Sequence, residues 1–362
     1  MTEAPTADAL FRAVKKLGLL EHLAGREDAR LLADPAAAAF LKTSWQGEFA
    51  HLLVSTDAPA AERARIGHLW ALSLQDEPRL KRYAATHFPK AAVKGFVGDA
   101  AVMASARADP FGEEAEVMAS PPPEVTWAIL CAPRTGSTWL SNLVRETGLL
   151  GRPTEHLRPL IRFMVENRRV FGFDFARWLA LLARSDQKDG IFGTKIIHDF
   201  ALELSPLLTL EERRSVDRLA ARSHFVHFRR RDRAAQAVSE YLAEATRTWH
   251  VRSPDGLARY EAEKAAVPYD GEKIGAAFAR HGAAEERVAS WLKRSGRPVL
   301  TLWYEDVLAA PRAAIEELHL FLTGRPAPAF RIPETRYQRL GNGLNEEMAG
   351  RFRREAGRQA DL

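Results

Sequence analysis

The sequence predicts an α/β protein built around a parallel β-sheet that helices cover on both faces. Two observations lead to this prediction. Short, nearly continuous apolar runs of strand length alternate with helical patterns between residues 125 and 304, as is typical of βαβ units. The first 120 residues show helical spacing alone. We therefore expect a three-layer α/β domain over residues 121–362, preceded by an all-α accessory domain over residues 1–120.

The N-terminal part is predicted to be helical because its large apolar residues recur three or four positions apart. This spacing occurs in two stretches: Leu10, Phe11, Val14, Leu17 and Leu20, and then Ile66, Leu69, Trp70 and Leu74. The segment Ala104–Pro123 contains few large apolar residues and ends in three prolines. Because such a run neither continues a helix nor joins a central strand, we expect a linker here.

Four apolar runs are expected to form the parallel sheet: Val125–Cys131, Ile191–Ile197, Phe225–Phe228 and Pro298–Tyr304. Helical patterns separate them, and the clearest are a helix that ends at Gly148, a natural C-cap glycine, and the segments Arg177–Gln187 and Ile274–Leu292. Beyond Pro326 the chain mixes Arg, Gly and Asn with little periodicity, so we expect an irregular segment that wraps the surface.

Composition and charge narrow the class of protein. Apolar residues make up 46% of the chain and charged residues 27%, which excludes disorder and fibrous repeats. The single cysteine, Cys131, excludes a disulfide scaffold and multi-cysteine zinc sites. A net charge of +5 favours an anionic ligand and does not require nucleic acid. With neither a signal peptide nor a membrane-spanning run visible, we expect a cytoplasmic protein, either monomeric or homo-oligomeric.

The octet Ala132–Trp139, between the first strand and its helix, carries the clearest chemistry. Gly136 permits a tight turn, and Ser137 and Thr138 place hydroxyl groups beside the unpaired amides of the helix start. Arg134 adds a permanent charge whose planar fork matches tetrahedral anions. The octet thus predicts a P-loop-like site for phosphate or sulfate. The alternative is a helix cap and a turn without a ligand.

This octet differs from the loop of nucleoside triphosphatases at one position. When Gly136 is aligned with the second glycine of G-x-x-x-x-G-K-[ST], Ser137 stands in the lysine position. The apolar run Phe225–Phe228 also leads into three arginines, where those enzymes have a metal-binding aspartate. We therefore expect no metal and a donor other than a magnesium-bound triphosphate, with a magnesium-dependent kinase or triphosphatase as the alternative. A non-catalytic interaction protein is a third hypothesis.

Five segments, in this order, resemble motifs of the sulfotransferases that use 3′-phosphoadenosine 5′-phosphosulfate (PAPS). The order resembles in particular the bacterial Stf0-like (trehalose 2-sulfotransferase) branch. The segments are Pro133–Leu140, similar to the 5′-phosphosulfate loop; Thr147–Glu155, similar to a G-x-P-x-E segment; Phe192–Lys195; Phe225–Ser239, similar to the 3′-phosphate motif; and Tyr304–Gly324. The resemblance as a whole covers about residues 124–357 and leaves the first 120 residues unexplained.

The resemblance implies PAPS as the donor, 3′-phosphoadenosine 5′-phosphate (PAP) as the product, and a hydroxyl of a carbohydrate or glycolipid as the acceptor. It assigns the binding of the 5′-phosphosulfate to Arg134, Thr135, Gly136, Ser137 and Thr138. It assigns the binding of the 3′-phosphate to Arg230 and Ser239, with Arg339 as a third candidate, and Arg231 is also counted among the nucleotide-binding residues. The flanking Arg229 and Arg231 leave the phosphate-facing arginine uncertain by one residue.

The resemblance also makes Glu155 the general base, whereas the sequence alone favours a solvated surface carboxylate. Lys195 interrupts an apolar strand, so it either faces the reacting group or reaches solvent at the strand end. His198 is an alternative base. The trio Trp249, His250 and Arg252 either lines an acceptor pocket or anchors a loop. Asp232 is expected to cap the helix that carries Ser239.

Overall fold

The computed structural model describes residues 19–44, 49–99, 114–157, 159–251, 253–332, 341 and 343–360. The chain divides into two compact units. The first comprises Met1–Pro122, Leu157–Asp186 and Glu203–Val216, and the second comprises Pro123–His156, Gln187–Leu202 and Asp217–Leu362. The first boundary coincides with the end of the expected linker. The two later segments of the first unit fall within residues 121–362, which were expected to form one domain.

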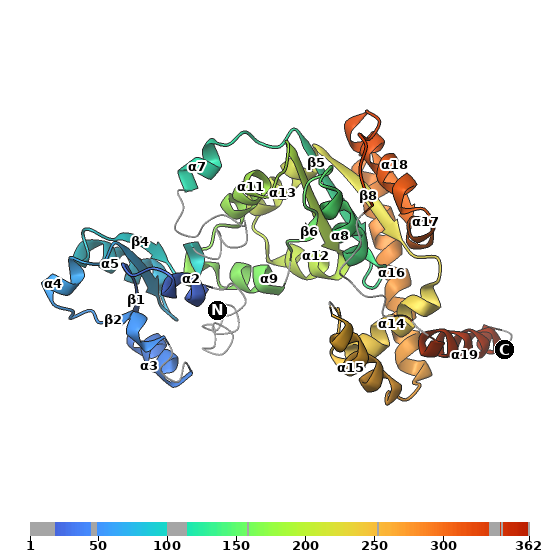
Figure 1. The fold of residues 1–362 in the computed structure, drawn as a ribbon, viewed down its shortest axis with the longest axis horizontal. Coiled ribbons are helices and arrows are strands. Elements are labelled where there is room, and N and C mark those ends of the chain that lie inside the picture. Colours follow the sequence, from blue (N-terminus) through green and yellow to red (C-terminus); the bar gives the residue numbers. More distant parts are fainter. Residues whose placement is uncertain are drawn as a thin grey trace. The chain divides into compact units, whose positions relative to one another are not determined.

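The second unit contains the predicted parallel sheet. Its five strands lie in the order β6-β7-β5-β8-β9, and all neighbouring strands are parallel (Figure 1). Two strands have the predicted bounds, two others agree within two residues, and β6 was not predicted. The strands are β5 (Val125–Cys131), β6 (Thr154–Glu155), β7 (Ile191–Ile197), β8 (Ser223–Arg229) and β9 (Val299–Trp303).

Most helices of the second unit follow its strands along the chain, and the predicted helices ending at Gly148 and covering 274–292 are confirmed. The region beyond Pro326 was expected to be irregular, but it contains a long C-terminal helix. The helices are α8 (Ser137–Thr147), α12 (His198–Leu204), α14 (Arg233–Thr246), α15 (Pro254–Ala265), α16 (Gly271–Ser295), α17 (Tyr304–Ala309), α18 (Pro311–Thr323) and α19 (Gly343–Ala360).

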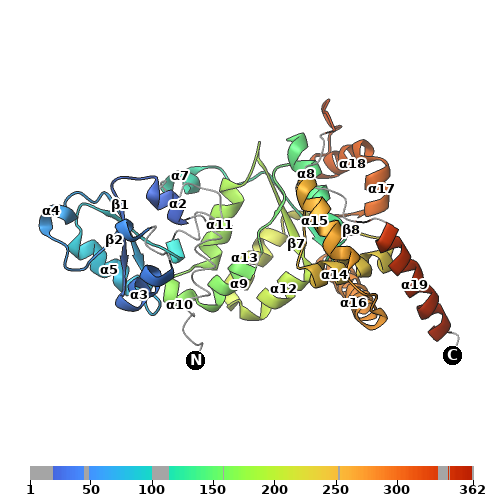
Figure 2. The same cartoon turned by 60° about the horizontal axis from the view of Figure 1, so that its bottom comes forward.

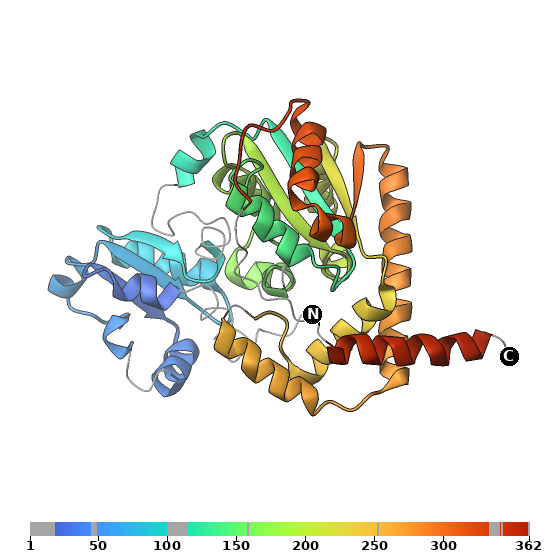
Figure 3. The ribbon, with the colours of Figure 1, turned by 45° about the vertical axis from the view of Figure 1, so that its right-hand side comes forward.

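Helices cover both faces of this sheet, which makes it the middle of three layers. Apolar side chains of β5, β8 and β9 pack on one face against α8, α17 and α18. On the other face, Leu130 and Phe225 pack against Val288 and Leu292 of α16, the long orange helix in Figure 3. Because both faces are buried, β5 is apolar along nearly its whole length, which is why its bounds could be predicted.

The C-terminal helix α19 packs against α14 and α16 (Figure 2). The contact is made by Met348, Ala349 and Phe352, which meet Ala237 and Ile274 in a small apolar cluster. The segment is rich in charged residues and glycine, so its sequence pattern is weak. Its helical form depends on tertiary packing of one apolar stripe rather than on propensity.

The strand order places a topological switch point between β5 and β8. After β5 the chain adds β6 and β7 on one side, and it then crosses over to add β8 and β9 on the other. Ligands of open parallel sheets bind at the carboxyl ends of the strands, at such a point. The segments that follow β5 and β8, residues 132–136 and 230–232, therefore meet where a ligand is expected.

The prediction of an all-α N-terminal domain is wrong, because the first unit contains a four-stranded parallel sheet in the order β2-β1-β3-β4. The helical spacing of Ile66, Leu69 and Trp70 was coincidental. In β3 the consecutive residues from Leu69 to Leu72 are all buried, and a short continuous apolar run cannot be assigned by periodicity alone. The other predicted stretch, Leu10–Leu20, lies outside the described residues except at its end, where Leu20 belongs to the short helix α2 (Leu19–Ala24).

The elements of the first unit include a short helix, α7, within the expected linker, and α11, which confirms the helix predicted over 177–187. No helix of the described ranges combines the length and apolar character that a membrane span requires. The elements are α2 (Leu19–Ala24), β1 (Ala29–Ala33), α3 (Pro35–Ser44), η1 (Ala50–Leu52), β2 (Leu53–Val54), α4 (Ala60–Arg63), β3 (His68–Leu72), α5 (Glu77–His87), β4 (Ala92–Gly95), α7 (Glu114–Ala119), α9 (Pro159–Glu166), α10 (Arg168–Phe171), α11 (Phe175–Ser185), η2 (Ser205–Leu207) and α13 (Leu210–Ala220).

Candidate active site

The β5–α8 loop, residues 132–136, turns sharply because two of its residues have left-handed backbone angles. Arg134 has a φ of 59° and Gly136 a φ of 86°. A Cβ atom on Gly136 would lie 2.5 Å from the ring of Tyr304, so only glycine fits without moving that ring. The loop leads directly into α8, whose first residues are Ser137 and Thr138. The free amides of this helix start favour an anion.

The Arg134 side chain extends from the loop to α14 and the segment after it. Its Nε donates a hydrogen bond to Ser239 Oγ at 3.1 Å, and its Nη1 donates to the Trp249 carbonyl at 2.8 Å. Burial lowers the pKa of the Arg134 guanidinium from its ordinary value, although an arginine remains charged. The loop therefore presents a fixed, largely desolvated positive charge.

The three consecutive arginines after β8 point to different partners. Arg230 donates from Nη1 to the Arg134 carbonyl at 3.3 Å, and its guanidinium lies 5.0 Å from the Tyr304 ring centre. Arg229 pairs with Glu285 at 2.7 Å, whereas Arg231 pairs with Asp306 in a bidentate arrangement at 2.6 and 2.7 Å. Of the three, Arg230 is the one that reaches the β5–α8 loop.

Helix α14 supplies two side chains to the loop from successive turns. Gln236 Nε2 donates to the Pro133 carbonyl at 2.6 Å, and Ser239 accepts from Arg134. The predicted cap is confirmed, since Asp232 accepts a hydrogen bond from the Ala235 amide at 3.0 Å. The cap fixes where the helix begins and thus which side chains face the loop.

Glu155 and Lys195 lie opposite each other on the neighbouring strands β6 and β7. The Lys195 amine is 2.8 Å from Glu155 Oε2 and donates to Thr138 Oγ1 at 3.0 Å. The Lys195 side chain is only 4% exposed, so it does not reach solvent. Lys195 of β7 thus places an amine at the loop, although the loop sequence itself contains no lysine. No single sequence motif could predict this placement.

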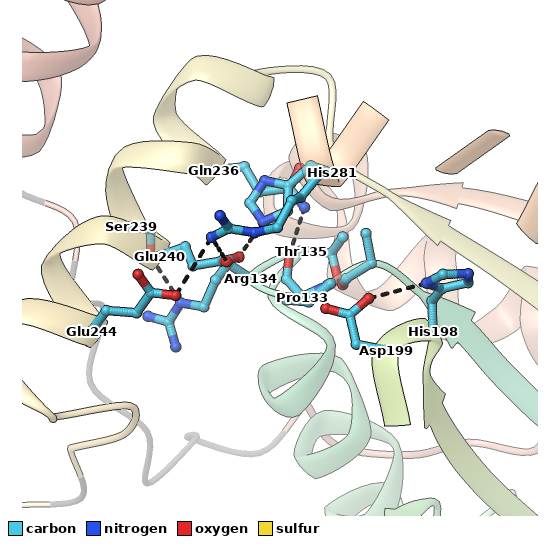
Figure 4. A network of polar contacts seen from close by, with 12 residues as sticks. Pro133, Arg134, Thr135, His198, Asp199, Gln236, Ser239, Glu240, Glu244 and His281 are labelled. Carbon is cyan, nitrogen blue, oxygen red and sulfur yellow. Dashed lines mark hydrogen bonds and ion pairs between the residues drawn. The ribbon is translucent and has the colours of Figure 1, made fainter. Parts of the chain in front are cut away.

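A buried polar network lies behind the start of the loop (Figure 4). Glu240, one turn after Gln236 on α14, contacts His281 and accepts from Arg280 at 2.7 Å. Burial alone would raise the pKa of Glu240, but the hydrogen bonds and charges of His281 and Arg280 hold it below its ordinary value. This network could not be predicted from the sequence, because its members are scattered over two helices and match no motif.

The remaining candidates have mixed placements. His198, the first residue of α12, is paired with Asp199 at 3.0 Å (Figure 4). Trp249 uses its carbonyl to anchor Arg134, and the residue is 44% exposed, which is compatible with both predicted roles, a pocket wall and a loop anchor. Arg339 and Arg252 lie outside the described residues. Among the described residues, no group of three His, Cys, Asp or Glu side chains is placed to hold a metal ion.

Comparison with known families identifies one match. The model of the Stf0 sulphotransferase family matches residues 126–355, a span that runs from β5 into α19 and covers more than half of the chain. No curated protein matches the sequence. The family match contains every described residue of the candidate site and agrees with the resemblance that the five motifs indicated.

Proposed function

The chain belongs to the Stf0 sulphotransferase family, and on this premise we propose that it transfers the sulfuryl group of PAPS to a hydroxyl of a carbohydrate or glycolipid. The acceptor class rests on analogy with the branch that the motifs resemble. Such a transfer needs a site for a nucleotide with two phosphate positions, a base for the acceptor hydroxyl, and positive charge near the leaving group.

The observation that carries the proposal is the meeting of three separate segments at the switch point. Arg134 follows β5, Arg230 follows β8, and Ser239 lies on α14. Arg134 bonds to Ser239 at 3.1 Å, and Arg230 bonds to the Arg134 carbonyl at 3.3 Å. Two guanidinium groups and a hydroxyl gathered at a helix start form a binding site for phosphate groups.

The residues present fit PAPS at both of its charged ends. Gly136 allows the loop its tight turn beside the Tyr304 ring, and Arg134 and residues 135–138 would hold the 5′-phosphosulfate. Arg230 and Ser239 would hold the 3′-phosphate. Arg231 is engaged with Asp306, so we propose Arg230 as the phosphate-facing arginine; Arg339 stays a prediction. When bound, PAPS supplies an activated sulfuryl group on a phosphate leaving group.

Glu155 is the proposed general base for the acceptor hydroxyl. Its side chain is 20% exposed and so remains accessible from solvent, whereas its partner Lys195 is buried. Lys195 orients the carboxylate at 2.8 Å and holds Thr138, at the start of α8, at 3.0 Å. The same amine adds positive charge at the amide end of the helix, where charge on a leaving phosphate would be stabilised.

The proposal is tested by two measurements on the full chain. Titration calorimetry with PAP should show saturable binding at a single site. Incubation with radiolabelled PAPS and a panel of acceptors should then label a carbohydrate or glycolipid, while phenols and peptides should stay unlabelled.

Absence of PAP binding would contradict the proposal as a whole. Binding of PAP with labelling of a different acceptor class would overturn the acceptor assignment alone. Hydrolysis of ATP that a chelator abolishes would favour a magnesium-dependent enzyme over a sulfotransferase.

A further inference from the structure

Strand β6, which carries Glu155, is only two residues long and lies at the edge of the sheet. Its first residue, Thr154, lies opposite Thr194 of β7. After His156 the chain passes from the second unit into a segment of the first. So short an edge strand has few backbone hydrogen bonds to hold it, and a fixed position of Glu155 therefore needs support from side chains.

His156, the residue that follows β6, connects the two strands through its ring. It is 9% exposed. Its Nε2 lies 2.8 Å from the hydroxyl oxygen of Thr154, and its Nδ1 lies 2.9 Å from that of Thr194. The Thr194 hydroxyl also donates to the Thr154 carbonyl at 3.3 Å. These three residues thus form a closed ring of hydrogen bonds, which we call the His156 clamp.

The donors available decide where the hydrogens of the His156 clamp lie. A threonine hydroxyl has one hydrogen, and Thr194 directs it to the Thr154 carbonyl. The Thr194 oxygen then accepts from His156, which places the imidazole hydrogen on Nδ1. Nε2 is left to accept from the Thr154 hydroxyl, so a neutral imidazole satisfies every bond. Because both ring nitrogens are engaged, His156 is suited to hold the strand and not to act as the base itself.

Packing fixes the same segment from two directions. The His156 ring is stacked on the ring of Phe192 in β7, with 5.7 Å between ring centres and 28° between ring planes. Before β6, the turn at Gly151 approaches β7 so closely that a Cβ atom would lie 2.5 Å from the Ile191 carbonyl. The segment is therefore held before β6 by a tight backbone contact and after β6 by the His156 clamp.

We propose that His156 and Thr194 are positioning residues, which hold Glu155 where it takes the proton of the acceptor hydroxyl. The inference rests on the proposed function and adds to it two residues that act through Glu155. Glu155 lies between Thr154 and His156 in the chain, so the His156 clamp fixes the backbone on both of its sides. Lys195 fixes only the carboxylate. A displacement of about 1 Å at a reacting group can cost roughly 100-fold in rate.

The first test removes one hydroxyl and keeps the shape of the side chain. Thr194→Val deletes the acceptor for His156 Nδ1 and should lower kcat about 10- to 100-fold, the range for a misplaced catalytic group. PAP affinity should stay at the wild-type value, because no proposed nucleotide ligand is changed. Thr194→Ser restores the hydroxyl and should recover most of the lost kcat. Steady-state kinetics, with an acceptor that the panel labels, and PAP calorimetry measure the two quantities.

Thr126→Val is the matched control. Thr126 is a buried threonine near the start of β5, whose hydroxyl donates to the Arg222 carbonyl at 3.0 Å and lies 3.0 Å from the Ser223 hydroxyl. Its loss should lower the melting temperature about as much as Thr194→Val does, since each variant loses the bonds of one threonine hydroxyl. It should leave kcat and PAP affinity unchanged.

A double-mutant cycle separates positioning from a general structural role. His156→Phe keeps an aromatic ring beside Phe192, loses both hydrogen bonds, and should lower kcat as Thr194→Val does. Combined with Glu155→Gln, it should lower kcat no further than Glu155→Gln alone, because the His156 clamp acts only through Glu155.

Several results would overturn the inference and leave the proposed function intact. These are wild-type kcat in Thr194→Val and His156→Phe, a Thr194→Ser variant no more active than Thr194→Val, an equal loss of kcat in Thr126→Val, and additive losses in the double variant. Wild-type kcat in Glu155→Gln, or failure of the wild type to bind PAP, would instead remove the proposed function on which the inference depends.

Discussion

Lys195 couples two parts of the candidate site through a single amine. It lies within hydrogen-bond distance of Glu155 on β6 and of Thr138 at the start of α8. A buried ammonium group is costly unless it is paired and hydrogen-bonded, and these two oxygens provide both. Because Lys195 is held on a central strand, Glu155 has a fixed position relative to the helix start.

Replacement of Glu155 by glutamine should lower kcat about 10²- to 10⁴-fold, because the amide cannot take a proton from the acceptor. The affinity for PAP should stay near the wild-type value, since Glu155 lies beside Lys195 and not among the proposed phosphate ligands. Steady-state kinetics and PAP calorimetry measure the two effects separately.

Glu146→Gln is the matched control, because Glu146 is an exposed carboxylate at the end of α8 that pairs with Arg145. It should keep wild-type kcat and PAP affinity. If Glu155→Gln also kept wild-type kcat, Glu155 would not be the base. A comparable loss of PAP affinity or of melting temperature would assign Glu155 a structural role through Lys195.

The three arginines after β8 offer an internal comparison with identical chemistry. Arg230→Ala should weaken PAP binding by roughly 1.5–3 kcal/mol, the range for a charged hydrogen bond. Arg231→Ala removes the same charge from an exposed pair with Asp306 and should leave PAP affinity unchanged. Calorimetry at one salt concentration measures both. If both variants lost PAP affinity equally, binding would depend on the total positive charge and not on the contact between Arg230 and the loop.

At the scale of single elements, α14 is the helix that organises the site. Asp232 caps its first turn, Gln236 holds the loop at the Pro133 carbonyl, and Ser239 holds Arg134. Asp232 also forms an ion pair with Arg353 of α19 at 2.6 Å. One side chain thus fixes the start of α14 and attaches the C-terminal helix to it.

Removal of the cap should destabilise the second unit. Asp232→Ala loses the acceptor for the Ala235 amide, which typically costs about 0.5–2 kcal/mol. Asp232→Asn keeps an oxygen for that amide and loses only the pairing with Arg353, a partly exposed ion pair worth about 0–1 kcal/mol. Urea unfolding should therefore rank wild type first, then Asn, then Ala. Equal destabilisation by Asn and Ala would show that the contact with α19 matters more than the cap.

At the scale of the whole molecule, the second unit was more predictable than the first. The strands β5 and β7 are buried on both faces, so the apolar run in the sequence begins and ends at the same residues as the strand. In the first unit β2 has two residues and β3 five, too short to separate a strand pattern from a helical one. The inclusion of segments 157–186 and 203–216 in the first unit depends on tertiary contacts that no local pattern records.

The parts of the candidate site that directly follow the ends of strands could be predicted from the sequence. Residues after β5 and β8 carry recognisable motifs, and the parallel topology brings them together. The contact of Lys195 with Thr138 was not predictable, because it depends on strand order and side-chain direction across the sheet.

The two units contain carboxylates with opposite electrostatic character. In the first, Glu77 at the start of α5 is 1% exposed and accepts hydrogen bonds from the amides of Val97 and Gly98, which follow β4. Burial raises the pKa of Glu77 well above its ordinary value despite these bonds. In the second, the pKa of Glu285 is lowered: burial opposes the shift, but the hydrogen bonds and charges of His227 and Arg229 prevail.

The first unit should therefore lose stability as pH rises, and the second unit should lose stability as pH falls. Folded Glu77 holds its proton more tightly than the unfolded chain, so the unfolding free energy of the first unit falls as pH rises from about 4.3, the ordinary glutamate pKa, through the raised value. Folded Glu285 holds its proton less tightly, so its stabilising contribution is present above that ordinary value and is lost as pH falls through the lowered one.

Hydrogen-exchange protection, corrected for intrinsic rates, should decline with rising pH in peptides that cover β4, and with falling pH in peptides that cover α16. Glu77→Gln keeps an acceptor oxygen and should flatten the β4 profile, whereas the exposed control Glu62→Gln should not. A β4 profile that is flat in the wild type, or the same in wild type and Glu77→Gln, would show that Glu77 does not govern the stability of the first unit.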